Sequence, residues 1–354
     1  MLQPLATALT RAGAGCRFGI DRRRRSSPRR AVAAAIAFVA VLVTATACSD
    51  GNDDATAPTT DRSTTERPTT TPPTTTPPTT ATPTTTPPTT TPPTTTRPSA
   101  PTTAQSGGFP GPSNTGVPPG TRLRPSGTVV VDQPGTVVDG LDITGTLEIS
   151  ADNVTVRRTR IRSDGDNWVV VWIEEGRTGI VIEDCEIDGL GKSGWPDGGA
   201  TGIQGEGVTV RRCDIHHVSD GMKSGSNVVF EDNWVHDLAA SGEPHYDGFQ
   251  LTGDVGDIAI RHNTISVPDQ TGAVNLGNTF GPIWNVVIDR NLLAGGTYTV
   301  YVDGKFSSDP ITGVSVTNNR FGWHQYGHVL VRDVTLAASS GNVDDKTGAP
   351  VVIE

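Results

Sequence analysis

The sequence has too few basic residues to balance its acidic ones. Its 354 residues include 28 Lys and Arg against 38 Asp and Glu, which gives a net charge of −10. The imbalance is larger in residues 108–354, which hold 17 of the basic and 32 of the acidic residues and carry a net charge of −15. Such a domain repels the phosphate backbone, so nucleic acid is excluded as a partner. Binding another polyanion would require a bridging cation.

The sequence also lacks an apolar run long enough for a permanent membrane span. Its one long apolar run, at residues 31–47, is short for a span and follows the basic stretch RRRRSSPRR at residues 22–30. A basic stretch, an apolar run and small residues together predict a secretory signal over residues 1–47. Arg29 and Arg30 leave both Sec and twin-Arg export open.

The end of this signal, TATAC, resembles the lipobox of bacterial lipoproteins, with Ala45 where that motif usually has Leu. The resemblance implies that Cys48 is lipidated and becomes the new N-terminus, which would anchor the protein to the outer face of the cytoplasmic membrane. Simple secretion, with Cys48 incidental, is the alternative.

Apolar side chains are almost absent from residues 48–107, most of which are Thr and Pro. Such a segment cannot bury enough apolar surface to offset the loss of chain entropy, so we expect a disordered linker. Proline keeps the chain extended at roughly 3 Å per residue, which gives a stalk on the order of 100 Å or more. A stalk of this length would suit a thick cell wall.

The remaining chain, residues 108–354, contains a repeat with no helical period. Positions 2, 4 and 9 of each copy are apolar, position 1 is Gly, Asn or Asp, and positions 5 and 6 are polar or charged, which is typical of short strands between turns. The copies start 20 to 30 residues apart. They read NVTVRRTRI (153–161), GIVIEDCEI (179–187), GVTVRRCDI (207–215), NVVFEDNWV (227–235), DIAIRHNTI (257–265), NVVIDRNLL (285–293) and GVSVTNNRF (313–321).

Short strands at this spacing predict a solenoid of stacked parallel strands. Position 7 holds Thr159, Cys185 and Cys213 in the first three copies, and then Asn233, Asn263, Asn291 and Asn319. Four successive Asn in register predict a buried ladder in which each amide bonds its neighbours along the axis.

This pattern resembles the right-handed parallel β-helix superfamily, which includes pectate lyases and related polysaccharide lyases, hydrolases and epimerases. The resemblance covers residues of about 126 to 345. It implies an all-β, single-stranded right-handed parallel β-helix over residues 126–354, a polysaccharide partner, and a monomer. Residues 108–125 look like the start of secreted bacterial proteins of this fold, and we expect them to cap the first coil and cover its open strand edge.

Cys185 and Cys213 share position 7 in consecutive copies. Their Cα atoms should lie about 4.8 Å apart, which is within disulfide range. A disulfide and a stacked pair of buried thiols both remain possible, and neither would be catalytic.

A second short strand precedes each repeat copy. Its apolar residues alternate inward, so the residues between them should form a column on the outer face. Aromatic rings can cover the apolar face of a sugar and amides can bond its hydroxyls, so this column predicts a polysaccharide groove. The column reads Trp172, Gln204, Lys223, Gln250, Asn275 and Tyr301, and all but Lys223 are the predicted substrate contacts.

The stretch GEPHYDGFQ (242–250) should form the wall and floor of this groove, because YDGFQ matches SDGMK one coil earlier. The match stacks Asp247 on Asp220 beside Lys223. We predict a lyase that cleaves an acidic glycan by β-elimination, with catalytic residues Lys223, His245, Asp247 and Asp220. Either Lys223 or His245 would be the base, and histidine ordinarily titrates close to neutral pH. Ca²⁺ would bind to Asp220, Glu243 and Asp247.

Three other functions stay open. Asp220 and Asp247 form the best-placed carboxylate pair for a glycoside hydrolase. EPHYD (243–247) faintly resembles the Asp-Pro-His-Asp motif of mannuronan epimerases, with Glu243 replacing the first Asp. A glycan-binding or adhesive wall protein would use the same groove without turnover. His216, His217, His236 and His245 have no zinc-ligand spacing, so we do not expect a zinc site.

Overall fold

The structure is a computed structural model that describes residues 108–165, 167–191, 200–240, 245–268 and 270–354. The predicted signal, the lipidated Cys48 and the Thr/Pro linker lie outside the described residues. Within the described residues the chain forms 27 strands and no helix. No helix in this part of the chain is therefore long and apolar enough to cross a membrane.

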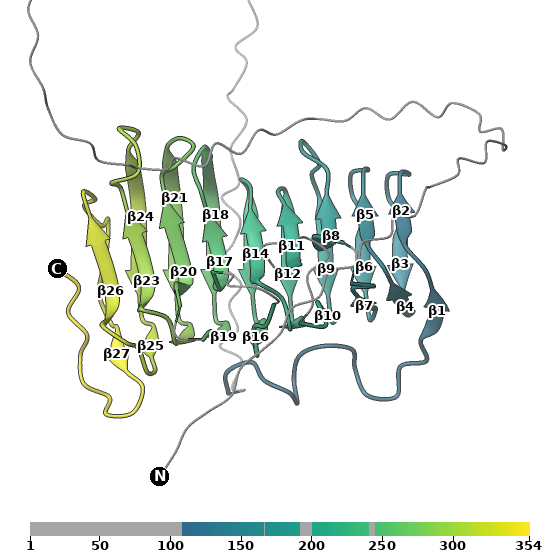
Figure 1. Ribbon diagram of the computed structural model, residues 1–354, viewed down its shortest axis with the longest axis horizontal. Helices are drawn as coiled ribbons and strands as arrows, with labels where there is room; N and C mark the ends of the chain where they lie inside the picture. The colour runs from purple at the N-terminus through teal and green to yellow at the C-terminus, as the bar shows by residue number, and fades with distance from the viewer. Residues whose placement is uncertain (1–107, 166, 192–199, 241–244, 269) are drawn as a thin grey trace, which may run out of the picture. The chain divides into compact units, whose positions relative to one another are not determined.

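The strands form three parallel sheets that wind around one core, and each coil before the C-terminal end contributes one strand to each sheet in turn (Figure 1). Sheet A contains, in order, β1 (Arg124–Ser126), β4 (Leu141–Thr144), β7 (Arg160–Arg162), β10 (Glu186–Asp188), β13 (Asp214–His216), β16 (Trp234–His236), β19 (Thr264–Ser266), β22 (Leu292–Ala294), β25 (Arg320–Phe321) and β27 (Val343–Asp344).

Sheet B contains the strands that precede the seven repeat copies and one further strand at each end: β2 (Val129–Val131), β5 (Leu147–Ile149), β8 (Val169–Ile173), β11 (Thr201–Gly205), β14 (Asp220–Ser224), β17 (Asp247–Leu251), β20 (Gly272–Gly277), β23 (Tyr298–Asp303) and β26 (Gly327–Arg332). Sheet C contains β3 (Val137–Asp139), β6 (Thr155–Arg157), β9 (Ile180–Glu183), β12 (Val208–Arg211), β15 (Val228–Glu231), β18 (Val255–Arg261), β21 (Ile283–Asp289) and β24 (Ile311–Thr317). The predicted parallel β-helix is confirmed.

The corners of the coil are set by residues with left-handed backbone. Position 1 of the repeat has positive φ in all seven copies, for example 57° at Asn153 and 61° at Gly207. Position 6 also has positive φ in every copy, including 53° at Arg212 and 50° at His262. Gly, Asn and Asp adopt this conformation at low cost, which explains their use at position 1. The two positions bracket the sheet C strands β6, β9, β12 and β15, whereas position 1 lies within the longer strands β18, β21 and β24.

The interior contains the predicted asparagine ladder. Asn263 illustrates its bonding: its Nδ2 donates to Phe230 O at 2.8 Å and to Asn291 Oδ1 at 3.0 Å, while its own Oδ1 accepts from Asn233 N at 2.9 Å and Asn233 Nδ2 at 3.1 Å. Asn263 is fully buried. Every polar atom of the amide is therefore bonded inside the core, as burial requires.

The ladder is one member longer than predicted. Asn342 accepts hydrogen bonds at Oδ1 from Asn319 N at 3.0 Å and from Asn319 Nδ2 at 3.1 Å, and it donates to Val316 O at 2.8 Å. Its sequence, LAASSGNVD at 336–344, has Ser339 and Asp344 at positions 4 and 9, which are apolar in the other copies, and Leu336 at position 1. Asn342 keeps position 7, but too little of the rest of the pattern remains for the copy to be recognised in the sequence.

At the other end of position 7, Cys185 and Cys213 are free and buried. Each thiol bonds a main-chain carbonyl: Cys185 Sγ lies 3.1 Å from Glu183 O, and Cys213 Sγ lies 3.4 Å from Arg211 O. Burial raises the pKa of the Cys185 thiol well above its usual range, so it stays protonated. The pair is the stacked thiol pair and not the disulfide.

Only the end of the N-terminal segment, predicted to cap the first coil with residues 108–125, lies at that coil. Phe109 stacks on the ring of His262 with centroids 5.5 Å apart, and Gly116 N donates to Arg212 O at 2.9 Å. Residues 109–116 therefore lie along the side of the middle coils, and the chain reaches the first coil only at β1, which pairs with β4 (Figure 1). Gly116 has φ of 77°, and a Cβ there would meet Asp214 Cβ at 3.0 Å, so glycine permits this close approach.

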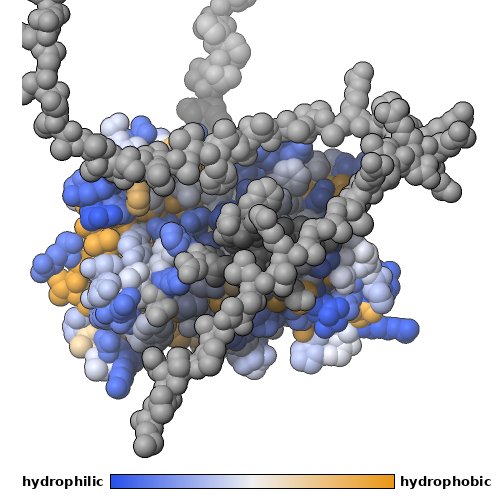
Figure 2. All heavy atoms as spheres, viewed as in Figure 1, coloured by the Kyte–Doolittle hydropathy of each residue, from blue (hydrophilic) through white to orange (hydrophobic). Residues whose placement is uncertain are grey.

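Figure 2 shows that the face in this view is mostly hydrophilic, with apolar side chains gathered near the C-terminal coils.

Candidate functional site

The outer column predicted for sheet B is present in register. Trp172 pairs with Gln204, Gln204 with Lys223, and Lys223 with Gln250. Gln250 then pairs with Asn275, and Asn275 with Tyr301. The residues that alternate with the column are all fully buried: Val171, Ile203, Met222, Phe249, Val274 and Val300.

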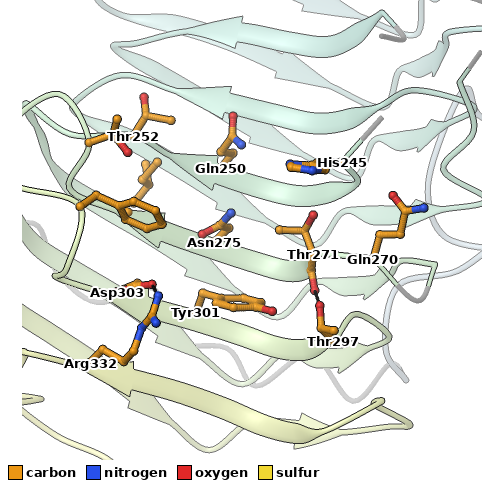
Figure 3. A pocket seen from close by; sticks show the side chains of 14 residues that line it. His245, Gln250, Thr252, Gln270, Thr271, Asn275, Thr297, Tyr301, Asp303 and Arg332 are labelled. Atoms are coloured by element: carbon orange, nitrogen blue, oxygen red, sulfur yellow. Dashed lines mark hydrogen bonds and ion pairs between the residues drawn. The ribbon is translucent and has the colours of Figure 1, made fainter. Parts of the chain in front are cut away.

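A cavity of about 690 Å³ opens over the C-terminal half of this column. Gln250, Asn275 and Tyr301 line its floor, and His245 lies at one side with Thr271 (Figure 3). The full lining is His245, Gln250, Leu251, Thr252, Gln270, Thr271, Asn275, Gly277, Thr279, Thr297, Tyr301, Asp303, Phe306 and Arg332. Trp172, Gln204 and Lys223 do not line it, so the structure separates the predicted groove into two parts.

The two stacked carboxylates lie beneath the surface. Asp220 pairs with Asp247 in register, and their side chains are buried, with Asp247 fully enclosed. Gln250 Nε2 donates to Asp247 Oδ2 at 2.7 Å, and Asn275 Nδ2 lies 3.3 Å from each oxygen. Asp247 thus holds two floor amides of the cavity from below and does not face the cavity itself.

Burial, together with the nearby charge of Asp220, raises the pKa of Asp247 to about 7. The hydrogen bonds from Asn275 and Gln250 act in the opposite direction but do not cancel these effects. A buried carboxyl that titrates near neutral pH is typical of functional sites.

Lys223 and Asp220 form an ion pair, with Lys223 Nζ 3.1 Å from Asp220 Oδ2. Ser219 Oγ also lies 3.1 Å from Asp220 Oδ2. The lysine side chain is partly exposed, but its ammonium is engaged with this buried carboxylate. Among the predicted catalytic residues, the structure therefore brings together Asp220, Asp247 and Lys223, and places His245 apart from Lys223 on the cavity wall.

His245 is exposed and lies two residues before the start of β17. Glu243 lies outside the described residues, so the predicted Ca²⁺ site at Asp220, Glu243 and Asp247 stays a prediction. Within the described residues, the one cluster whose donor atoms converge closely enough for a metal ion is Asp188, His216 and His217, on another part of the coil.

Several cavity residues were missed by the sequence analysis. Arg332 forms an ion pair with the buried Asp303 and donates a hydrogen bond to its carboxylate. This hydrogen bond raises the pKa of the Arg332 guanidinium. Phe306 is one of the most exposed large apolar side chains, at 58%. Arg332 could have been found from the sequence. GHVLVR (327–332) comes after the seventh repeat copy, at the place where an outer strand comes after each earlier copy, and it pairs with β23.

Aromatic rings gather at the same end. Tyr298 contacts Tyr301 edge-on at 5.6 Å between centroids, and Tyr326 lies 6.2 Å from Tyr298. Tyr326 is 68% exposed. The cavity thus combines amides, aromatic rings, an imidazole and a guanidinium on one face.

Residues 141–293 match the family model described as "Right handed beta helix region". Among solved structures, the chain is similar to the Dettilon tailspike protein (gp208), at 16% identity and a TM-score of 0.37. That similarity covers 62% of this chain and 53% of the tailspike, so the chain spans about half of its length. No curated protein matches the chain.

Proposed function

We propose that this protein of the right-handed parallel β-helix superfamily binds an acidic polysaccharide on the outer face of sheet B and cleaves it by β-elimination. One observation carries the proposal: His245 lines the same cavity as Gln250, Asn275, Tyr301 and Arg332. A candidate base, amides, an aromatic ring and a cation thus surround one space in which a sugar could be held.

Binding would use the floor of the cavity. Tyr301 offers a ring face to the C–H surface of a sugar, while Gln250 and Asn275 offer amide oxygens to its hydroxyls. Asp247 acts here as a positioning residue, because its carboxylate holds the NH₂ groups of both amides at 2.7–3.3 Å. The carbonyl oxygens of the two amides would then be available to accept hydrogen bonds from a ligand.

In the chemical step, His245 would take the proton α to the uronate carboxyl. The C–O bond at the β carbon then breaks, a C=C bond forms, and the leaving oxygen takes a proton from water. Arg332 would offset the negative charge that develops on the carboxyl group, since it lines the same cavity. Lys223 is a weaker candidate for the base, because its ammonium is paired with Asp220.

The test is a panel of polyuronates, with and without Ca²⁺, followed by the ultraviolet absorbance of the unsaturated product. His245→Ala should lower turnover at least about a hundredfold, the usual contribution of a general base. Gln204→Ala is the matched control, because Gln204 belongs to the same column but lies outside the cavity. Equal turnover in wild type and His245→Ala would rule out His245 as the base.

A non-catalytic glycan-binding protein is the second candidate. The observation in its favour is that Asp247 is fully buried and Lys223 is engaged by Asp220, so neither is free to react. This function predicts that a glycan binds to the wild type, that no product forms, and that His245→Ala binds it as tightly. New reducing ends without ultraviolet absorbance would instead indicate a hydrolase.

We further propose that Cys48 carries a lipid that holds the protein on the outer face of the cytoplasmic membrane, with residues 48–107 as the stalk. The signal sequence and its TATAC end support this. Cys48→Ser should release the protein into the medium, as measured by blotting membrane and medium fractions. Continued membrane association of the variant would contradict lipid anchoring.

A further inference from the structure

A cluster of metal-ligating side chains lies at the corner that follows sheet A, outside the cavity. Asp188 ends β10 and His216 ends β13, and the two residues pair in register across neighbouring coils. His217 is the next residue along the chain. Three donor atoms from two coils meet here: Asp188 Oδ1, His216 Nδ1 and His217 Nδ1.

The distances between the three atoms suit coordination of one small ion. His216 Nδ1 lies 2.9 Å from His217 Nδ1, His217 Nδ1 lies 3.0 Å from Asp188 Oδ1, and His216 Nδ1 lies 3.7 Å from Asp188 Oδ1. Nitrogen and oxygen ligands at about 2.0–2.1 Å from a tetrahedral zinc ion lie about 3.4 Å from one another. The observed distances fall on both sides of that value, so small side-chain rotations would complete the triangle.

The facing ring nitrogens of His216 and His217 limit the hydrogen bonding within this cluster. A neutral imidazole donates from one nitrogen and accepts at the other, so His216 Nδ1 and His217 Nδ1 can share a single proton between them. Asp188 Oδ1 already accepts from Leu190 N at 2.8 Å. One shared proton cannot form full hydrogen bonds with all three atoms, whereas a divalent cation would be coordinated by all three at once.

The surroundings hold the two imidazoles in place. Glu186 Oε1 lies 3.8 Å from the other ring nitrogen of His216, an ion-pair distance that is longer than a hydrogen bond. The carbonyl of His216 accepts from Gly189 N at 3.1 Å, and that of His217 accepts from Gly191 N at 2.9 Å. His217 itself has φ of 52°, a conformation that few residue types other than Gly tolerate.

His236 stands one coil further in the same column but is not a fourth ligand. Its Nε2 lies 2.8 Å from Asp214 Oδ1 and its Nδ1 lies 2.8 Å from Asp237 Oδ2, so both nitrogens are engaged. Its ring stacks on His216 at 5.3 Å between centroids. It therefore packs against the cluster and provides a natural control.

We propose that Asp188, His216 and His217 bind one divalent transition-metal ion, with zinc as the best match to two imidazoles and a carboxylate. The site joins two neighbouring coils and leaves one coordination position toward solvent, where the His217 side chain is 46% exposed. Its ligands were not found by sequence spacing because Asp188 comes from the preceding coil.

The experiment is titration of Zn²⁺ into the full-length chain after chelation and dialysis, followed by isothermal calorimetry. The wild type should bind about one Zn²⁺ per chain. His217→Asn and Asp188→Asn should each weaken this binding at least about a hundredfold, since both remove a ligand and even a lost second-shell partner costs about 10–100-fold. Asparagine tolerates the left-handed backbone at residue 217, so that variant should fold.

His236→Ala is the matched control and should bind Zn²⁺ within a fewfold of wild type. Zn²⁺ should also raise the unfolding temperature of the wild type and of His236→Ala, but not that of His217→Asn, because only a bound ion stabilises the folded state. Absence of Zn²⁺ binding by the wild type, or binding that His217→Asn and Asp188→Asn leave unchanged, would overturn the proposal.

Discussion

Asn263 and Asn275 carry the same amide, but one is enclosed between coils and the other lines the cavity. The Asn263 amide makes four hydrogen bonds within the ladder, and all of its polar atoms are used. Asn275 uses only its NH₂ group, toward Asp247 at 3.3 Å, and its Oδ1 accepts no bond from the described residues. Asparagine therefore occurs in two columns of the coil. In the inner column its amide bonds neighbouring coils together, and in the outer column its carbonyl oxygen is left to accept a hydrogen bond from a ligand.

Asp247 is where the two columns meet, because it is buried like the ladder and bonded to the outer amides. Its pKa is raised to about 7 in the folded protein, against about 3.9 in an unfolded chain. The carboxyl therefore favours folding below about pH 4, and this contribution is lost as the pH rises through about 7. Asp247→Asn stays neutral, so from about pH 4 to about pH 8 its stability relative to wild type should rise by roughly 2–4 kcal/mol.

Urea unfolding of both proteins across this pH range measures the difference. Parallel stability curves for wild type and Asp247→Asn would show that Asp247 stays ionised in the folded protein, as an exposed aspartate would. The amides of Gln250 and Asn275 would then be held by a carboxylate whose pKa is not raised.

The inner column is tested by Asn263→Leu. This change removes the acceptor of Asn233 N and Nδ2 and the donor to Phe230 O, so the free energy of unfolding should fall by about 1–3 kcal/mol. Asn275→Leu is the matched variant in the outer column and should change stability far less. Both variants are measured by denaturant unfolding. An equal loss in the free energy of unfolding would contradict the proposed difference between the inner and the outer column.

The outer column is tested by the affinity for whichever polyuronate binds in the panel. Asn275→Ala should weaken binding by about 0.5–1.5 kcal/mol, the usual net value of one hydrogen bond. Gln204→Ala, in the same column outside the cavity, should leave the affinity unchanged. Equal losses in both variants, measured by calorimetry, would place the ligand along the whole column instead of in the cavity.

The smallest effect is expected where the ladder ends. Cys213 N already donates to Asn233 Oδ1 at 2.9 Å, and Cys213 Sγ lies 3.7 Å from Ile182 O, the carbonyl that a ladder Asn would reach. Cys213→Asn should extend the ladder and change stability by less than about 1 kcal/mol. The reverse change, Asn233→Cys, should cost more in the same unfolding assay, and a large loss for Cys213→Asn would show that the thiol end cannot accept an amide.

The features that follow from the period of the repeat could be predicted from the sequence. The ladder at Asn233 to Asn319 and the column from Trp172 to Tyr301 both need only a constant register, because parallel strands stack equivalent positions. The left-handed corners at position 1 could also be foreseen, since Gly, Asn and Asp suit them.

Features that depend on a neighbouring coil or on a connecting segment could not be predicted in this way. The burial of Asp247 follows from Gln250 and Asn275 closing over it, although its Asp-Gly sequence reads as a turn. The cavity takes in Phe306 from the segment that connects β23 to β24, where the repeat sets no register. Asp188 meets His217 only because of the coil spacing, which no local motif records.

The placement of residues 109–116 along the middle coils has a mechanical consequence. A pull applied through residue 108 would act first on the Phe109–His262 ring contact and then on the hydrogen bond from Gly116 to Arg212. The load would reach β1, the free edge of sheet A, only after this strap had peeled away. Tension on the N-terminal side is thus borne first by the contacts of residues 109–116 with the middle coils, and by the first coil only after these contacts break.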